Sequence, residues 1–333
     1  MPAVTDIGID LGTSTVIVYV KGKEILLQEP CLVAYDRDRN IIRAVGEEAE
    51  HTIGRATGNI MAIRPMRDGV ITDFTVAEQM LQYFIRKSMG HRNFLKPRIV
   101  ICMPSGVTDI EKHAVEEITY RTGARDAVIV RAPVVAAMGA GLDILRANGN
   151  MIVDVGGGIT EIASLSLGGV VVSQTIKVAG DAFNEAIVQY VRDAHGLYID
   201  VTTAEKIKIG IGSSRRRGDV LTRMEVRGRD IDAGFPRTVT LTPDQVREAV
   251  SGKVRQIVEA VRTIIEKTPP DLATDIAARG IVLTGGGAQL AGLDKAIERL
   301  TGITTILCED PQTAVARGTG QYIRQMVRLE QER

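Results

Sequence analysis

One local pattern occurs twice in the chain and constrains the fold more than any other sequence feature. A β-branched segment runs into Asp10-Leu11-Gly12, and a similar segment later runs into Asp154-Val155-Gly156. Each copy continues as two further strand patterns with short turns, over residues 6–27 and 151–172. Turns this short cannot carry a parallel crossover, so each copy predicts an antiparallel meander. We interpret the recurrence as an internal duplication of the fold.

Helix and strand patterns fill the remainder, which indicates an α/β protein. Asp181 is an expected N-cap for a helix ending at His195, and Thr242 for a helix that stops before Pro269-Pro270. Residues 28–64 are polar and turn-rich apart from a short helix near 47–53. The other predicted helices are 74–85, 109–122, 133–145, 202–211 and 313–329, the other strands are 98–103, 127–130, 280–283 and 304–308, and residues 213–240 are expected to form an exposed basic hairpin region.

The size and charge of the chain narrow its class. A chain of 333 residues is too long for one small core, so two lobes are expected. Lys plus Arg equals Asp plus Glu at 41 each and Trp is absent, so nothing points to nucleic acid as a partner. Cys31, Cys102 and Cys308 lie far apart in apolar runs, which predicts buried thiols in a reducing compartment. We expect no signal peptide and no membrane span, and therefore a cytoplasmic protein.

Three glycine-containing turns follow apolar strands, at residues 10–15, 154–158 and 284–287. Glycine lets backbone N–H groups approach an anion, and consecutive N–H groups form a concave anion site. The hydroxyls of residues 13–15 add donors. Asp10 and Asp154 would repel phosphate directly, so they make sense if a partly hydrated Mg²⁺ lies between them and the phosphates.

A single turn of this kind is more often an ordinary structural hairpin, whereas three together favour phosphate binding. The chain has no G-x-x-x-x-G-K-[ST] sequence, so it is not a P-loop protein. No G-x-G-x-x-G follows the first strand within a βαβ unit, which disfavours a dinucleotide-binding fold.

These motifs resemble the actin superfamily, which includes actin, the heat-shock chaperone ATPases and the sugar kinases. The resemblance covers nearly the whole chain and is closest to the MreB/Mbl family of bacterial cell-shape proteins. It implies an actin-like fold with two duplicated lobes around a nucleotide cleft. The stretches that carry the family resemblance are residues 7–13, 45–49, 63–65, 68–71, 139–142, 154–158, 179–181, 203–205, 227–230 and 283–288.

The resemblance also implies a domain organisation. Lobe I would span residues 1–145, with a small subdomain at about 33–65, and the C-terminal helix 318–333 would return to it. Lobe II would span residues 146–317, with a small subdomain at about 181–243.

The resemblance assigns an ATP or ADP site residue by residue. The β- and γ-phosphates would lie between the two glycine hairpins, with Asp10 and Asp154 holding Mg²⁺ through water. Glu205 and Lys208 would lie near the ribose. The implied phosphate contacts are Gly12, Thr13, Ser14, Thr15, Gly156, Gly157 and Gly158, and the implied adenine contacts are Gly286, Gly287, Ala288 and Gln289.

Two positions depart from the family pattern. The family usually has Glu-Pro where this chain has Ala132-Pro133, and that Glu is the expected water-positioning residue. The family usually has Thr where this chain has Ile159. Apolar side chains cannot orient or deprotonate water, and losing a general base costs roughly 10²–10⁴-fold in rate. We therefore expect ATP binding with slow hydrolysis.

Neighbouring residues offer only partial replacements. Arg131 stays protonated and cannot act as a base. The alternative is that Glu161 substitutes, and Thr160 beside it is the other remaining candidate. No residue is assigned as catalytic beyond these.

A basic segment around residues 86–98 contains the apolar pair Phe94-Leu95. The resemblance implies that an apolar loop here touches the inner leaflet of the cell membrane, with each basic residue adding roughly 1 kcal/mol near anionic lipid. Many copies in a filament would strengthen a weak contact. The alternative is an ordinary solvated loop, which is also the preferred interpretation of residues 213–217.

The expected function is that of an ATP-binding, filament-forming bacterial actin homologue on the inner membrane face. It would assemble with itself and with cell-elongation membrane proteins, and it would help to organise cell-wall synthesis and rod shape. A non-polymerising nucleotide-binding scaffold or a small-molecule kinase of the same fold are the alternatives. A chaperone ATPase would need a further peptide-binding domain.

Overall fold

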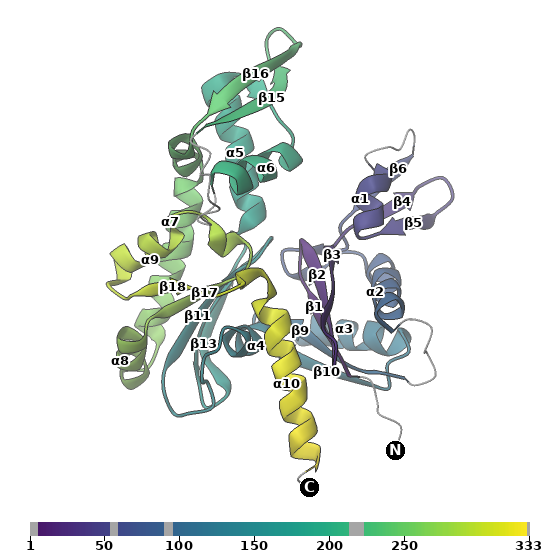
Figure 1. The fold of residues 1–333 in the computed structure, drawn as a ribbon, viewed down its shortest axis with the longest axis vertical. Helices are drawn as coiled ribbons and strands as arrows, with labels where there is room; N and C mark the ends of the chain where they lie inside the picture. The colour runs from purple at the N-terminus through teal and green to yellow at the C-terminus, as the bar shows by residue number, and fades with distance from the viewer. Residues whose placement is uncertain (1–5, 54–58, 90–95, 213–222, 332–333) are drawn as a thin grey trace.

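The computed structural model describes residues 6–53, 59–89, 96–212 and 223–331. Two five-stranded sheets form the centres of two lobes that lie side by side (Figure 1). The strand order is β10-β9-β1-β2-β3 in lobe I and β13-β12-β11-β17-β18 in lobe II. The strands are β1 (Asp6–Leu11), β2 (Thr15–Val20), β3 (Glu24–Pro30), β9 (Arg98–Met103), β10 (Asp126–Arg131), β11 (Asn150–Val155), β12 (Thr160–Ser166), β13 (Gly169–Ile176), β17 (Ile281–Thr284) and β18 (Thr305–Leu307).

The two sheets share one topology. In each, the first three strands are antiparallel neighbours, and two later strands add in parallel beside the first strand. Both predicted meanders are therefore confirmed, as is an α/β fold with two sheet-containing lobes. The predicted lobe boundary near residue 145 stays a prediction.

Each lobe carries a smaller sheet at the upper end of Figure 1. In lobe I it contains β4 (Val33–Asp36), β5 (Ile41–Val45) and β6 (Ile60–Ile63), with α1 (Glu47–Ile53) on one face. In lobe II it contains β14 (Leu197–Tyr198), β15 (Met224–Asp230) and β16 (Pro236–Leu241). A two-stranded ribbon, β7 (Met66–Arg67) with β8 (Val70–Ile71), follows the first small sheet.

Helices cover the sheets. Each lobe has its own apolar core, and a third core joins the lobes through two helices, α4 and α10. The helices are α2 (Phe74–Met89), α3 (Asp109–Arg121), α4 (Ala132–Gly139), α5 (Gly180–His195), α6 (Val201–Ile211), α7 (Pro243–Lys267), α8 (Pro270–Arg279), α9 (Leu293–Thr301) and α10 (Ala314–Gln331), with 3-10 turns η1 (Gly287–Gln289) and η2 (Pro311–Thr313).

Two glycines let α4 and α10 touch backbone to backbone. A Cβ atom on Gly139 would lie 1.8 Å from the Ala314 carbonyl oxygen, and one on Gly318 would lie 1.7 Å from the Val135 carbonyl oxygen. Beyond this crossing, α10 packs on β1, β2 and β9 of lobe I. The Arg98 guanidinium holds α10 against lobe I, because it pairs with both Asp6 of β1 and Glu330 of α10.

Several predicted elements were wrong in detail. Residues 28–64 hold three strands besides the expected helix, because β4 and β5 are short and bulged and show no clear alternation. The helix predicted over 133–145 ends at Gly139, and the unpredicted α8 begins directly after the proline stop. Asp181 lies inside α5 rather than capping it, for a reason given below. Phe94, Leu95 and residues 213–217 lie outside the described residues.

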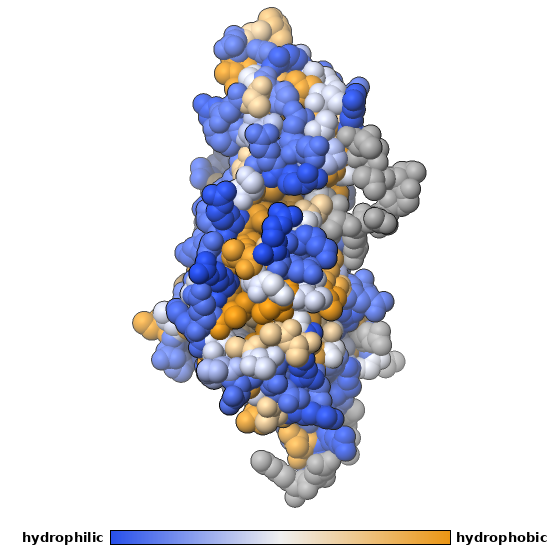
Figure 2. Space-filling view, turned by 90° about the vertical axis from the view of Figure 1, so that its left-hand side faces the viewer, coloured by the Kyte–Doolittle hydropathy of each residue, from blue (hydrophilic) through white to orange (hydrophobic). Residues whose placement is uncertain are grey.

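The outer side of lobe II, which carries α8, α9 and β18, has apolar residues gathered at mid-height between more hydrophilic regions (Figure 2). On these elements Leu300 and Ile306 are exposed.

None of the helices in the described part of the chain has the length and apolar character needed to span a membrane.

Candidate functional site

The two glycine turns meet directly at the junction of the lobes. Hairpin 1 is the turn between β1 and β2, and hairpin 2 is the turn between β11 and β12. A Cβ atom on Gly157 would lie 2.0 Å from Ser14 Oγ, and one on Gly158 would lie 2.8 Å from the Thr13 side chain. Any side chain at these two positions would force the hairpins apart. The sequence motifs predicted each turn, but only the fold brings them face to face.

Hairpin 1 is supported from a second direction by the β7–β8 ribbon. The Gly69 N–H donates to Thr13 Oγ1 at 3.2 Å in a buried setting. Asp68 precedes it with a positive φ of 50° and pairs with Lys177 of lobe II at 3.8 Å. A Cβ atom on Gly158 of hairpin 2 would lie 3.2 Å from the Asp68 backbone N, so the ribbon lies against both hairpins, a role that its sequence alone did not indicate.

Hairpin 2 caps a helix. The Gly156 and Gly157 carbonyl oxygens accept hydrogen bonds from the N–H groups of Gly180 and Asp181, at 3.1 and 2.7 Å. These bonds satisfy donors at the start of α5, so the helix needs no side-chain cap. Asp181 is instead free to face Arg64 of lobe I, 3.7 Å away.

Asp10 and Asp154 stand next to the ends of β1 and β11, one in each lobe. Burial and, to a smaller extent, the charge of Asp154 together raise the pKa of Asp10 to about 7. Burial also raises the pKa of Asp154 to about 6, although the Thr284 hydroxyl donates to it at 3.0 Å and opposes the shift. The two carboxylates therefore repel each other across the junction.

A divalent cation would relieve this repulsion. Mg²⁺ usually keeps several waters and uses one or two carboxylates, so two facing Asp residues fit a partly hydrated Mg²⁺. Across the described ranges, no group of three or more His, Cys, Asp or Glu side chains could enclose a metal. The donor set thus fits Mg²⁺ held beside another ligand rather than in an all-protein cage.

The third glycine turn packs on hairpin 2. Gly285 has a φ of 86°, and a Cβ atom there would lie 2.2 Å from the Val155 carbonyl oxygen. Gly287, Ala288 and Gln289 form the buried turn η1, while Gly286 stays exposed. Of the four residues that the resemblance assigns to the adenine pocket, Gly286 is therefore the one with a large solvent-exposed surface.

A polar cluster lies next to hairpin 2. Lys208 Nζ donates to Glu205 Oε2 at 2.7 Å and to the Gly180 carbonyl oxygen at 3.2 Å. Asn184 Nδ2 donates to the same Glu205 oxygen at 2.5 Å, while the buried Asn184 Oδ1 accepts no hydrogen bond in the described part of the chain. The structure thus brings together Glu205 and Lys208, as the resemblance implied, and adds Asn184, which sequence reasoning missed.

The positions expected to orient water are apolar. Ile159 lies against Gly69 and Pro104, where a Cβ atom on Gly69 would meet Ile159 Cδ1 at 2.8 Å. Ala132 begins α4 and packs against the core between the lobes. Thr160 is fully buried, and its hydroxyl donates to the Val178 carbonyl oxygen at 2.6 Å.

Glu161 is a buried carboxyl that spans the junction. It is 2% exposed and accepts a hydrogen bond from the Ser105 N–H of lobe I. Burial raises its pKa to about 7, which the Ser105 bonds and the charge of Arg131 oppose. The Arg131 side chain is exposed and makes no hydrogen bond or ion pair within the described residues. Glu161 with Arg131 is therefore one ionisable pair beside the two departures, and Asp68 with Lys177 lies next to Gly69 on the other side of Ile159.

Comparison with known proteins agrees with this geometry. The family model described as "MreB/Mbl protein" matches residues 4–331. The cell shape-determining protein Mbl of Bacillus cereus is 45% identical over 324 residues, covering 97% of this chain and 97% of that protein. The cell shape-determining protein MreB of Escherichia coli is 47% identical over 324 residues, covering 96% of this chain and 93% of that protein.

Solved structures give the same result. MreB5 of Spiroplasma citri, bound to AMPPNP, superimposes with a TM-score of 0.93 at 33% identity, covering 100% of this chain and 99% of that one. A MamK double helical filament gives a TM-score of 0.78 at 20% identity, which supports the fold alone, with 97% and 99% covered. The chain therefore belongs to the MreB/Mbl family, as its motifs predicted.

Proposed function

We propose that this chain binds ATP or ADP between its two lobes and assembles with itself into filaments that help to determine cell shape. The observation that carries this proposal is the direct approach of the two glycine hairpins beside Asp10 and Asp154. Their N–H groups provide the anion site and their carboxylates the site for hydrated Mg²⁺. A relative of the same family, MreB5, was solved with AMPPNP and with ADP, which supports a nucleotide here.

Each lobe contributes half of the proposed site. Residues 12–15 of lobe I and residues 156–158 of lobe II would bind the phosphates. Glu205 and Lys208 would bind the ribose, and residues 286–289 would line the adenine pocket. A ligand that contacts both lobes favours their closed arrangement, and this bias is how nucleotide state would control assembly.

The test is ultracentrifuge pelleting of the full chain with ATP, with ADP and without nucleotide, with negative-stain microscopy of the pellets. Filaments that form with ATP would support the proposal. A protein that stays in the supernatant under all three conditions, across salt and with liposomes, would favour a non-polymerising scaffold or a small-molecule kinase instead.

We further propose that hydrolysis is slow, because Ala132 and Ile159 replace the polar groups that would orient water. The variant carrying Ala132→Glu and Ile159→Thr should release phosphate about 10²-fold faster than the parent. A parent chain that already hydrolyses ATP as fast as the double variant would contradict the proposal. If Glu161→Gln then abolished that activity, Glu161 would be the substitute group.

Finally, we propose that the filaments lie on the cytoplasmic face of the cell membrane and act with cell-elongation membrane proteins in cell-wall synthesis. The support is sequence alone, namely Phe94-Leu95 among basic residues. Phe94→Ser with Leu95→Ser should reduce co-sedimentation with anionic liposomes while ATP-dependent pelleting persists. Unchanged co-sedimentation would remove the membrane contact from the proposal.

A further inference from the structure

The small sheet of lobe I ends at β5. Within the residues that the structure describes, β5 pairs only with β4, so its other side is an edge. The Gly46 N–H donates to the Leu32 carbonyl oxygen at 2.8 Å. Hydrogen-bonded and non-bonded pairs alternate along antiparallel strands, so the next pair, Val45 with Val33, is a non-bonded pair. The N–H and C=O of Val45 therefore point away from β4, toward the edge.

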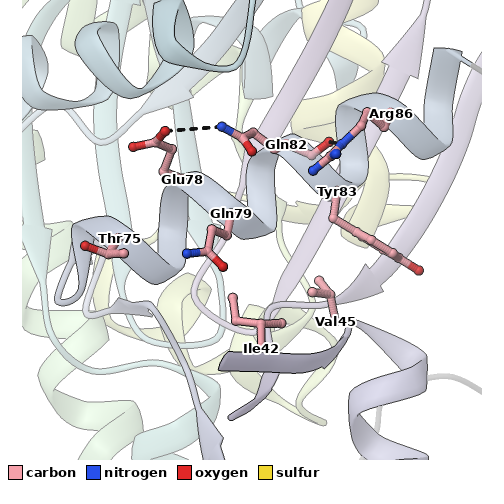
Figure 3. Close-up of a pocket in the computed structure, with 8 residues that line it drawn as sticks. All are labelled: Ile42, Val45, Thr75, Glu78, Gln79, Gln82, Tyr83 and Arg86. Carbon is pink, nitrogen blue, oxygen red and sulfur yellow. Dashed lines mark hydrogen bonds between the residues drawn. The ribbon is translucent and has the colours of Figure 1, made fainter. Parts of the chain in front are cut away.

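A groove of about 560 Å³ lies beside this edge, between β5 and α2. Figure 3 shows Ile42 and Val45 on the β5 side and the side chains of α2 on the other. Ile42 and Val45 belong to the sheet face that packs toward the core with α2, whereas Ala34 and Ala44 face α1. The groove is thus the space above α2 that one more strand beside β5 would cover.

The lining of the groove indicates what would fill it. Ile42, Val45 and the ring of Tyr83 provide apolar surface, and polar side chains of α2, among them Glu78 and Arg86, complete the walls. A strand lying here would place every second side chain into the groove. An apolar residue at alternate positions therefore fits the space.

The lining carries one cation, Arg86, and one anion, Glu78. Arg86 Nε donates to the Gln82 carbonyl oxygen at 3.1 Å, and within the described residues the Arg86 guanidinium has no carboxylate partner. Glu78 already pairs with Arg121 at 3.7 Å and accepts a hydrogen bond from Gln82 at 3.2 Å. An incoming carboxylate would therefore meet an unpaired cation, whereas an incoming ammonium would have to compete with Arg121 for Glu78.

We propose that β5 and this groove bind an extended, acidic segment of a partner protein by strand addition. The segment would hydrogen-bond to the edge of β5, place alternate apolar side chains over α2 and pair a carboxylate with Arg86. The surface lies on the side of lobe I away from lobe II (Figure 1). It goes beyond the proposed nucleotide-dependent assembly, because none of its residues belongs to the hairpins.

The probe is a fluorescent peptide of about nine residues in which valine alternates with threonine and aspartate, made in both sequence directions. Anisotropy is read on the supernatant after centrifugation, without nucleotide, so that filaments do not contribute. The aspartate peptide should bind, and its lysine counterpart should bind more weakly, by up to about fivefold. N-methylation at one alternate set of residues should abolish binding while methylation of the other set is tolerated, because a strand directs only every second N–H to a given neighbour.

Two variants locate the binding. Arg86→Glu should reverse the preference between aspartate and lysine peptides, and Gln79→Trp should block the groove. Arg255→Glu, an exposed arginine on α7 of the other lobe, is the matched control and should leave binding unchanged. Failure of every peptide to exceed its scrambled control would overturn the inference, as would binding that ignores N-methylation.

A second copy of this chain is the competing occupant. If Arg86→Glu and Gln79→Trp abolished self-association while no peptide bound, the groove would be a filament contact and the inference would be wrong. If the peptides bind but no filaments form with ATP, the strand-addition surface stands and the proposed function fails. The two proposals are therefore separately testable.

Discussion

Glu161→Gln should stabilise the nucleotide-free protein, by an amount that grows as pH rises from about 4.5 to about 7. Glu161 is 2% exposed, and burial raises its pKa from the ordinary value of 4.5 to about 7. The folded protein therefore binds this proton more tightly than the unfolded chain does. As pH rises from about 4.5 to about 7, the unfolded chain loses the proton first, so the free energy of unfolding falls across this window.

The size of the effect follows from the shift. A pKa change of one unit corresponds to 1.36 kcal/mol, so a rise from 4.5 to about 7 costs about 3 kcal/mol once both states are ionised. Gln keeps a carbonyl oxygen that can accept the Ser105 N–H, and the neighbouring Ser105 hydroxyl can accept from the new amide. The substitution therefore removes the charge without removing the hydrogen bond.

The assay is thermal unfolding of parent and variant at about pH 8 and about pH 5. At the higher pH we expect the variant to melt about 6 °C above the parent, at roughly 2 °C per kcal/mol for a chain of this size. At the lower pH the two should nearly coincide. Glu225→Gln, on the exposed surface of β15, is the control and should change stability by less than about 0.5 kcal/mol at either pH. Equal stabilisation at both pH values, or a variant less stable at pH 8, would refute the reasoning.

Three further substitutions test the close contacts. Gly139→Ala should destabilise the protein by about 3 kcal/mol in denaturant unfolding, since its Cβ would overlap α10. Gly252→Ala, on the open face of α7, should be neutral or stabilising. Equal effects of the two substitutions would contradict the backbone contact. Gly157→Ala should weaken fluorescent-nucleotide binding about tenfold by separating the hairpins, and Gly169→Ala, whose nearest neighbour is 3.8 Å away, should not. Arg98→Met should lower the free energy of unfolding by about 3 kcal/mol, because it leaves Asp6 with only Lys21 as a partner. Arg262→Met, which breaks an exposed ion pair on α7, is the control, and a loss at Arg98 smaller than the loss at Arg262 would show that the buried network contributes little.

The sequence predicts well what local chemistry decides. Short turns force antiparallel neighbours, and the two meanders follow from them. Thr242 caps α7 as expected, with the full reciprocal pair of hydrogen bonds to Gln245. The family resemblance then places Glu205 beside Lys208, because three residues along one helix lie on one face.

Tertiary contacts decide the parts that were missed. Asp181 has the chemistry of an N-cap, but the carbonyl groups of hairpin 2 already satisfy the start of α5. The pattern of small residues after Pro133 continues past the true end of α4. The stop is made by Gly141, which has a φ of 82° and whose N–H donates to the Met138 carbonyl oxygen at 2.9 Å, while the Leu142 N–H donates to that of Ala137 at 2.9 Å. Asn184 carried no motif, so only its position next to Glu205 identifies it as part of the candidate site.

Helix α4 links the chemistry of the junction to the arrangement of the lobes. It begins at Ala132, where a water-positioning residue was expected, and it ends at Gly139, in backbone contact with α10. It also contacts β9 and β10 of lobe I and β11, β12 and β13 of lobe II, while α10 is fixed to lobe I by Arg98 with Glu330 and by Cys102 with Thr319. The path from the hairpins, where a ligand would bind, to the helix crossing at which the lobes meet is therefore short and closely packed.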